Sequence, residues 1–181
     1  MKRLVLAPHP ASPPASVSGI EVEVERPRAG QLRLRYTVLG DIGRLRLPSP
    51  AAPARTDELW KHTCFEAFVR PGAGPAYWEL NLSPSTEWAA YGFDAERSGM
   101  RPAERVAAPR IETESGADRY ELTAVVDLGL SGDAAWRLGL SAVIEEIDGA
   151  RSWWALAHPA ARPDFHHPDA FTLDLPASES P

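Results

Sequence analysis

The sequence holds a single cysteine, Cys64, in 181 residues. One thiol cannot form an intramolecular disulfide, and a zinc site built from several thiolates is excluded. No apolar run approaches the ~20 residues that a transmembrane helix needs. The run Leu4–Ala7 is also shorter than the roughly 7–15 apolar residues of a secretory signal. The sequence therefore predicts a cytoplasmic protein that does not interact with a membrane.

Clusters of lysine and arginine are absent as well, and the formal net charge is −6. A protein that binds nucleic acid gathers basic side chains on one face, so no nucleic-acid partner is expected. The sequence also has no Gly-rich phosphate-binding loop and no Gly-x-Ser-x-Gly nucleophile motif. These absences count against nucleotide-binding proteins and against serine hydrolases of that type.

The hydrophobic pattern is that of strands. No segment keeps an apolar period of 3.6 residues beyond about two turns, whereas short alternating runs separated by turn residues are frequent. Besides three strands in the segment 59–93, strands are predicted at Ile20–Glu25, Gln31–Val38, Ile111–Glu114, Tyr120–Asp127, Trp136–Ile147, Ser152–Ala157 and Phe171–Leu175. The expected fold is all-β, an antiparallel sandwich of two sheets (immunoglobulin-like or jelly-roll type) with short helical turns in loops.

The length suits one well-buried domain and is short for two. Residues 1–18, rich in Pro, Ala and Ser from Ala7 onward, are expected to form a loose lead-in. Residues 19–176 are expected to form a single domain, and residues 177–181 a polar tail. The sequence leaves the oligomeric state open.

The segment 59–93 contains the strongest functional signal. Each of its first two strand patterns has one apolar face and one mixed face, because side chains alternate across a strand. Glu66 lies on the mixed face of the first strand, and Glu79 and Asn81 lie on that of the second. If the two mixed faces align, these three side chains converge beside aromatic rings. That composition suits a polyhydroxylated ligand.

The tryptophans divide between core and rim. Trp60 follows a polar linker at the expected start of a strand, which favours a rim position, whereas Trp88 could lie in the core or at a site. Trp153 and Trp154 are adjacent, so on a strand one of them points inward and the other outward. Exposed rings can stack on the apolar face of a sugar, and binding pockets commonly combine aromatic walls with a few polar groups.

The segment His158–Asp169 concentrates histidine and aspartate between prolines. Imidazoles and carboxylates suit zinc or another transition metal. The alternative is an irregular loop in which these side chains cap turns, and the spacing matches no helical metal motif. Phe165, flanked by Asp164 and His166, fits the rim of a ligand site better than a closed metal cage.

Two other chemistries stay open. Glu66 and Glu79 could act, together with a histidine, as the acid and base of a sugar-acting enzyme, since glycosidases place two carboxyl groups across the scissile bond. Met100 with a histidine could ligate haem iron, although no Cys-x-x-Cys-His attachment motif is present. A ligand-binding role without catalysis and without a cofactor is the leading interpretation, with calcium or haem as alternatives.

Several motifs together resemble a known family. They are Leu59-Trp60, Phe65–Val69, Tyr77–Asn81, Ser83-Pro84, Trp88, Tyr91, Trp154–Leu156, Pro163–His166, Pro168 and Phe171. The pattern resembles a DOMON-like domain and is similar to the family 9 carbohydrate-binding modules of bacterial xylanases. It covers roughly Leu59 to Leu175, and its subgroup is one of small bacterial proteins.

The resemblance implies a β-sandwich that binds sugar or haem in a cleft on one face. It places Trp60 and Phe165 at the two aromatic positions that clamp the sugar, and Glu66 at the glutamate that bonds its hydroxyls. Phenylalanine at the second position is a departure, because the family has tryptophan there. The complete predicted ligand-binding set is Trp60, Glu66, Glu79, Asn81, Trp88, Asp164, Phe165 and His166, and the predicted partner is a small sugar-like molecule.

Overall fold

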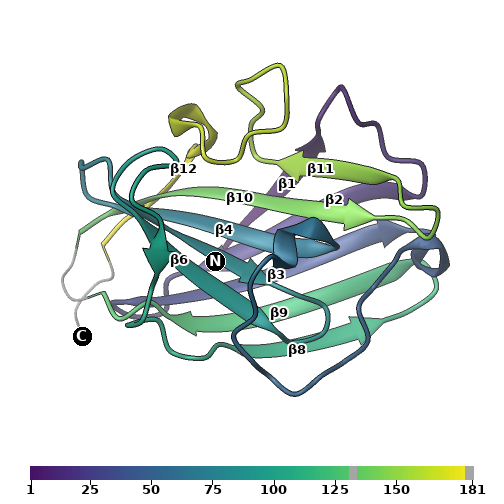
Figure 1. Cartoon of the computed structure of the whole chain (residues 1–181), viewed down its shortest axis with the longest axis horizontal. Helices are drawn as coiled ribbons and strands as arrows, with labels where there is room; N and C mark the ends of the chain where they lie inside the picture. Colours follow the sequence, from purple (N-terminus) through teal and green to yellow (C-terminus); the bar gives the residue numbers. More distant parts are fainter. Residues whose placement is uncertain (131–133, 178–181) are drawn as a thin grey trace.

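The computed structural model describes residues 1–130 and 134–177 (Figure 1). In these residues the strands form one antiparallel sheet that is curled on itself, in the order β7-β6-β5-β4-β10-β11-β1-β2-β3-β9-β8, with β12 paired to β10. The strands are β1 Lys2–Pro8, β2 Val17–Glu25, β3 Gln31–Gly40, β4 Cys64–Pro71, β5 Tyr77–Leu82, β6 Trp88–Phe93, β7 Arg101–Pro102, β8 Arg110–Ser115, β9 Arg119–Asp127, β10 Trp136–Glu145, β11 Arg151–Ala155 and β12 Leu173–Leu175. The all-β class is therefore confirmed.

Helical structure in the described residues is limited to single 3-10 turns, η1 Ile42–Arg44, η2 Leu59–Lys61 and η3 Pro168–Ala170. None of these turns has the length or the apolar composition to cross a membrane. Trp60 lies in η2, just before β4, and not at the start of a strand as the sequence analysis expected.

Two expectations about the architecture need correction. A loose lead-in was expected at residues 1–18, but Lys2–Pro8 forms β1. Lys2–Leu6 pair with β2, and Ala7 and Pro8 pair with β11. Because β1 pairs with both neighbours, all the strands belong to one curled sheet, where two separate sheets were expected. The tail predicted at 177–181 lies, apart from Ala177, outside the described residues.

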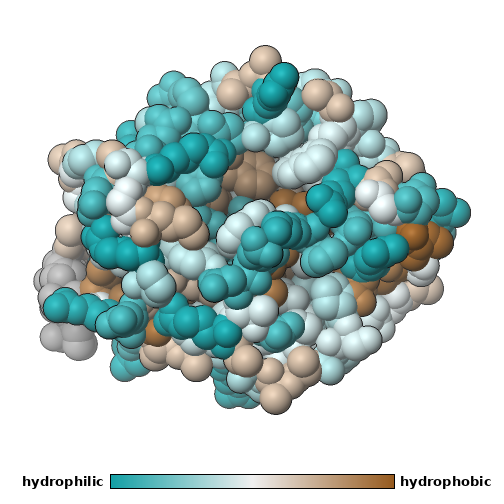
Figure 2. Space-filling model, viewed as in Figure 1, coloured by the Kyte–Doolittle hydropathy of each residue, from teal (hydrophilic) through white to brown (hydrophobic). Residues whose placement is uncertain are grey.

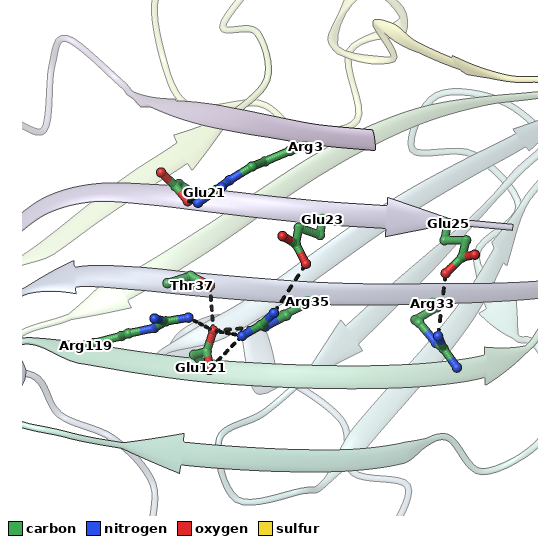
Figure 3. A network of polar contacts seen from close by, with 9 residues as sticks. All are labelled: Arg3, Glu21, Glu23, Glu25, Arg33, Arg35, Thr37, Arg119 and Glu121. Carbon is green, nitrogen blue, oxygen red and sulfur yellow. Dashed lines mark hydrogen bonds and ion pairs between the residues drawn. The ribbon is translucent and has the colours of Figure 1, made fainter. Parts of the chain in front are cut away.

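One half of the sheet, β1-β2-β3-β9-β8, is apolar on its inner face and charged on its outer face. Ile20, Val22 and Val24 of β2 are fully buried, while the glutamates between them point outward. Figure 3 shows the outer side chains as a lattice of opposite charges, in which Arg35 bonds Glu121 and lies 3.4 Å from Glu23. Because only the outer face meets solvent, apolar and charged residues alternate along these strands, and this alternation made the strands predictable from the sequence.

The inner faces of the two halves pack on each other to form the main core. Rings from opposite halves meet there: Phe65 of β4 stacks on Tyr120 of β9, with centroids 6.1 Å apart. The hydroxyl of Tyr36 on β3 donates to the backbone oxygen of Glu66 at 2.6 Å. Trp136 is 1% exposed and completes one end of the core.

The other half, β6-β5-β4-β10-β11, is buried on both faces. Its outer face carries a second apolar cluster made of Phe68, Tyr77, Ala89, Tyr91, Phe93 and Phe171, with Leu59, Trp60 and Phe165 packed against it. The covering segments are therefore η2 and the chain between β11 and β12. Figure 2 shows this side of the molecule, with hydrophilic side chains around a recess that contains apolar groups. The candidate site lies here.

Candidate ligand-binding site

A cavity of about 350 Å³ lies on the outer face of this half of the sheet. Strands β4, β5, β6, β10 and β11 provide its floor, and η2, the segment after β6 and the segment after β11 provide its walls. The lining residues are Trp60, Glu66, Glu79, Phe93, Arg97, Met100, Val143, Trp153, Pro163, Phe165 and His166. Its size falls at the lower end of small-molecule pockets.

Two carboxyl groups lie at the floor of the cavity. Glu66 of β4 is 3% exposed and Glu79 of β5 is 5% exposed. The strand register pairs Glu66 with Asn81 and Phe68 with Glu79, so both glutamates project from the same face of adjacent strands. The two mixed faces are therefore aligned, and Glu66, Glu79 and Asn81 do lie on one face.

Neutral polar side chains next to these carboxyl groups donate hydrogen bonds to them. Asn81 is fully buried and donates from Nδ2 to Oε1 of Glu79 at 2.8 Å. Ser141 of β10 donates from Oγ to Oε2 of Glu66 at 3.3 Å. Cys64 contributes a weak contact, from Sγ to Oδ1 of Asn81 at 3.6 Å. Asn81 thus orients Glu79 and does not itself line the cavity.

Burial changes the acidity of both glutamates. Loss of hydration raises the pKa of Glu66 well above its ordinary value, and the negative charge of Glu79 raises it further. Burial likewise raises the pKa of Glu79, although the hydrogen bond from Asn81 and the charge of Arg97 oppose that effect. The carboxyl groups of Glu66 and Glu79 are therefore weaker acids than exposed carboxyl groups.

His166 connects the floor to the wall. Its Nδ1 lies 2.7 Å from the hydroxyl of Tyr77, and its Nε2 lies 3.7 Å from Oε2 of Glu79. The Tyr77 oxygen accepts a hydrogen bond from the backbone N–H of Arg97 at 3.3 Å, which leaves the phenol proton to donate to Nδ1. This assignment puts the imidazole proton on Nε2, facing Glu79.

The imidazole is neutral near pH 7. Burial, followed by the positive charge of Arg97, lowers the pKa of His166 to about 4. Its ring packs edge-on against Phe68 and Phe93, with centroids 5.1 Å away in each case. An apolar surrounding of this kind explains why the charged form is disfavoured.

Arg97 lines the rim, and its charge is balanced locally. One guanidinium nitrogen of Arg97 lies 2.7 Å from Oδ1 of Asp164, which also accepts from the backbone N–H of His166 at 3.1 Å. Burial alone would raise the pKa of Asp164, but these contacts with Arg97 and His166 outweigh it and the pKa falls. Asp164 therefore fixes the rim and does not face the cavity.

Aromatic rings form the remaining walls. Trp60 meets Tyr91 edge-on, with centroids 6.0 Å apart, and Phe165 lies 6.4 Å from Phe68. Trp153 of β11 is partly exposed, whereas its neighbour Trp154 is 2% exposed and belongs to the main core. The predicted split between these two tryptophans is thus confirmed.

The predicted site residues fall into three groups. Five of them line the cavity: Trp60, Glu66, Glu79, Phe165 and His166. Asn81 and Asp164 hold lining residues in place from outside the cavity. Trp88, by contrast, is 5% exposed and belongs to the main core on the opposite face of β6, with the guanidinium of Arg55 over its ring at 4.3 Å.

Other lining residues were not in the predicted set. Phe93 and Val143 lie on strands that are buried on both faces. Apolar and polar residues do not alternate there, so the sequence does not show which side chains face the cavity. Arg97 and Pro163 come from irregular segments. Met100, considered above only as a haem ligand, lines the cavity with 51% of its surface exposed. In the described part of the chain, no three His, Cys, Asp or Glu side chains are arranged to hold a metal ion.

Comparison with known proteins supports the fold. No family model matches the sequence, and no curated protein matches it. The structure is similar to the crystal structure of a proposed carbohydrate-binding protein from Bacteroides uniformis ATCC 8492, with a TM-score of 0.71 and 15% sequence identity. The similarity covers 94% of this chain and 84% of that one. At this identity it establishes a shared fold, the one that positions the cavity described above.

Proposed function

We propose that this protein is a non-catalytic binding module for a carbohydrate or a sugar-derived metabolite, and that the ligand occupies the cavity on the outer face. The observation that carries the proposal is the composition of that cavity: aromatic rings on its walls and two buried carboxyl groups on its floor. Rings can cover the apolar face of a sugar, while the carboxyl groups accept hydrogen bonds from its hydroxyls.

Two further points support the proposal. The structurally similar protein is itself described as a proposed carbohydrate binder. A kinship with DOMON-like domains and family 9 modules, suggested by the sequence motifs, is part of the same proposal. The cavity volume suits a mono- or disaccharide better than a polymer, which agrees with the expected cytoplasmic location and with a soluble sugar or a cell-wall precursor as ligand.

The test is a thermal-shift screen against neutral, amino and acidic sugars, disaccharides and nucleotide sugars, followed by calorimetry of any hit. A ligand that binds only the folded state raises Tm in proportion to RT ln(1 + [L]/Kd). A saturable shift with at least one sugar is expected. If no member of the panel shifts Tm or gives a calorimetric signal, the proposal fails.

A matched pair of variants locates the bound sugar. Trp153 and Trp78 are both partly exposed, but Trp153 lines the cavity and Trp78 packs against the main core. Trp153→Ala should weaken sugar binding, whereas Trp78→Ala should leave Kd within about threefold of the unaltered protein. Equal losses in both variants would argue against this cavity as the site.

A second candidate is an enzyme that acts on a sugar. One observation favours it: Glu66 and Glu79 project from the same face of adjacent strands. Burial, and after it the charge of Glu79, raise the pKa of Glu66, so one carboxyl can stay protonated as an acid while the other is ionised. Slow hydrolysis of a glycoside panel, lost in Glu66→Gln, would establish this activity. Binding without turnover across the same panel would leave the non-catalytic module.

A further inference from the structure

The charges around the cavity are unbalanced. Arg97 is the one cation among the lining residues, and Asp164 already pairs with it at 2.7 Å. His166 is neutral near pH 7, since its pKa is about 4. Glu66 and Glu79 therefore face the cavity without a cationic partner within hydrogen-bonding distance among the described residues, the closest approach being His166 Nε2 to Glu79 at 3.7 Å.

The carboxyl of Glu66 has hydrogen-bonding capacity left over. Its side chain is almost wholly buried, and among the described residues its carboxyl accepts one hydrogen bond, from Oγ of Ser141 to Oε2 at 3.3 Å. A carboxylate offers about four acceptor positions. Glu66 lines the cavity, and none of the described residues donates a hydrogen bond to its Oε1. A buried acidic group in this position is suited to a donor supplied by a ligand.

We propose that the cavity selects ligands that carry a protonated amine, which makes an amino sugar the class it recognises within the function proposed above. An ammonium group placed between Glu66 and Glu79 donates three hydrogen bonds and supplies the missing positive charge. The aromatic walls add to this, because the faces of tryptophan and phenylalanine rings attract cations. Acidic sugars are disfavoured by the same two carboxyl groups.

Binding of an ammonium should release a proton. Where Glu66 is protonated in the free protein, the incoming cation favours its ionised form, and the proton leaves to the buffer. The titratable or charged groups around Glu66 on the packed elements are Cys64, Glu79, Tyr36, His166 and Arg97. Of these, Glu79 is the one whose charge raises the pKa of Glu66, so the pair determines how many protons are released.

The experiment is calorimetry of the full chain with glucosamine, galactosamine and 6-amino-6-deoxyglucose, each compared with its neutral parent sugar and with glucuronate. Measurements at pH 6.5 in phosphate and in HEPES buffer give the number of protons released. At least one amino sugar should bind about tenfold or more tightly than its parent, with proton release, and glucuronate should bind more weakly than glucose.

Variants separate charge from shape. Glu66→Gln keeps the size of the side chain, removes its charge and relieves a buried acidic group, so the variant should fold. It should lose at least about tenfold of its affinity for the amino sugar while its affinity for the neutral parent changes little. The control is Glu114→Gln on the exposed strand β8, which should change neither affinity.

The outcomes distinguish the two proposals. Neutral sugars that bind as tightly as amino sugars, without proton release, would overturn the amine preference and leave carbohydrate binding in place. A non-sugar amine such as 2-aminopropane-1,3-diol that binds in a Glu66-dependent way, with no sugar binding at all, would support amine selection and overturn the carbohydrate proposal. An absence of binding by sugars and amines alike would overturn both.

Discussion

Substitution of Trp60 by alanine, compared with the same substitution of Trp88, tests whether Trp60 serves in ligand binding or in core packing. Both are tryptophans that the sequence placed near the ligand. In the structure Trp60 is partly exposed on η2 and lines the cavity, whereas Trp88 is 5% exposed in the main core. The two substitutions to alanine should therefore act on different properties: Trp60→Ala on binding, and Trp88→Ala on stability.

The magnitudes follow from the contacts. Trp60→Ala removes one edge-on ring contact, with Tyr91 at 6.0 Å, and partial burial, which together contribute about 1–2 kcal/mol. At about 2–4 °C per kcal/mol for a chain of this length, Tm falls by about 2–8 °C. Trp88→Ala empties a core position at a cost of about 3–5 kcal/mol, which lowers Tm by about 6–20 °C.

The effect on binding should be the reverse. Loss of an aromatic wall of a small site costs about 2 kcal/mol or more, so Kd for the sugar found in the screen should rise about 30-fold or more in Trp60→Ala. Kd should stay within about threefold in Trp88→Ala, measured by calorimetry at a temperature where that variant is folded. The reasoning is refuted if Trp60→Ala lowers Tm as much as Trp88→Ala and leaves Kd unchanged.

Three further predictions concern stability and pH. Glu66→Gln should raise the free energy of unfolding by more than about 1 kcal/mol at pH 7, because burial raises the folded-state pKa of Glu66 and disfavours its ionised form. Ionisation of Glu66 opposes folding only above the pKa that this group has in the unfolded state. Urea denaturation at pH 4 should therefore show no difference between the variant and the unaltered protein. Tyr36→Phe should cost about 1–2 kcal/mol in urea unfolding, as it removes the 2.6 Å bond to the Glu66 backbone between the two halves; an unchanged midpoint would contradict that role. Burial alone would raise the pKa of Glu121, but its bonds from Arg35, Arg119 and Thr37 lower it to about 2. Its contribution of about 1–3 kcal/mol should be present above pH 4.5 and disappear as pH falls towards 2, and Glu121→Gln should remove that part of the acid sensitivity.

The strands were predictable where one face of the sheet meets solvent. In β2 and β9, apolar and polar residues alternate because only the inner face is buried. Between β10 and β11 the chain has Asp148-Gly149, a pair of residues typical of turns, and Gly149 adopts a φ of +88° that favours glycine. Glu66, Glu79 and Asn81 could be placed together for a similar reason. Side chains alternate between the two faces of a strand, so the sequence shows which residues share a face, and the antiparallel pairing of β4 and β5 brings these three side chains to the same face.

Other features depended on contacts that a local pattern does not contain. In β6, residues 88–93 are all buried, so alternation could not tell that Trp88 faces the core while Phe93 faces the cavity. The role of β1 depends on pairing with β2 at one end and with β11, more than 140 residues away, at the other. Arg97, Met100 and Pro163 reach the cavity from irregular segments, whose paths are set by tertiary contacts.

The buried carboxyl groups are the feature that stability alone does not explain. Glu66 and Glu79 raise each other's energy when ionised, and both are removed from water, so their presence on this face opposes folding. Neighbouring positions of the same face are apolar, as at Phe68 and Val143, which shows that the sheet can be covered there without charge. Ser141 and Asn81 reduce the cost but do not remove it. A ligand that supplies donors or a positive charge would offset the cost that remains. Without ligand, Glu66→Gln should therefore have a higher free energy of unfolding than the unaltered protein. With saturating ligand the order should reverse, because the ligand stabilises the unaltered protein more.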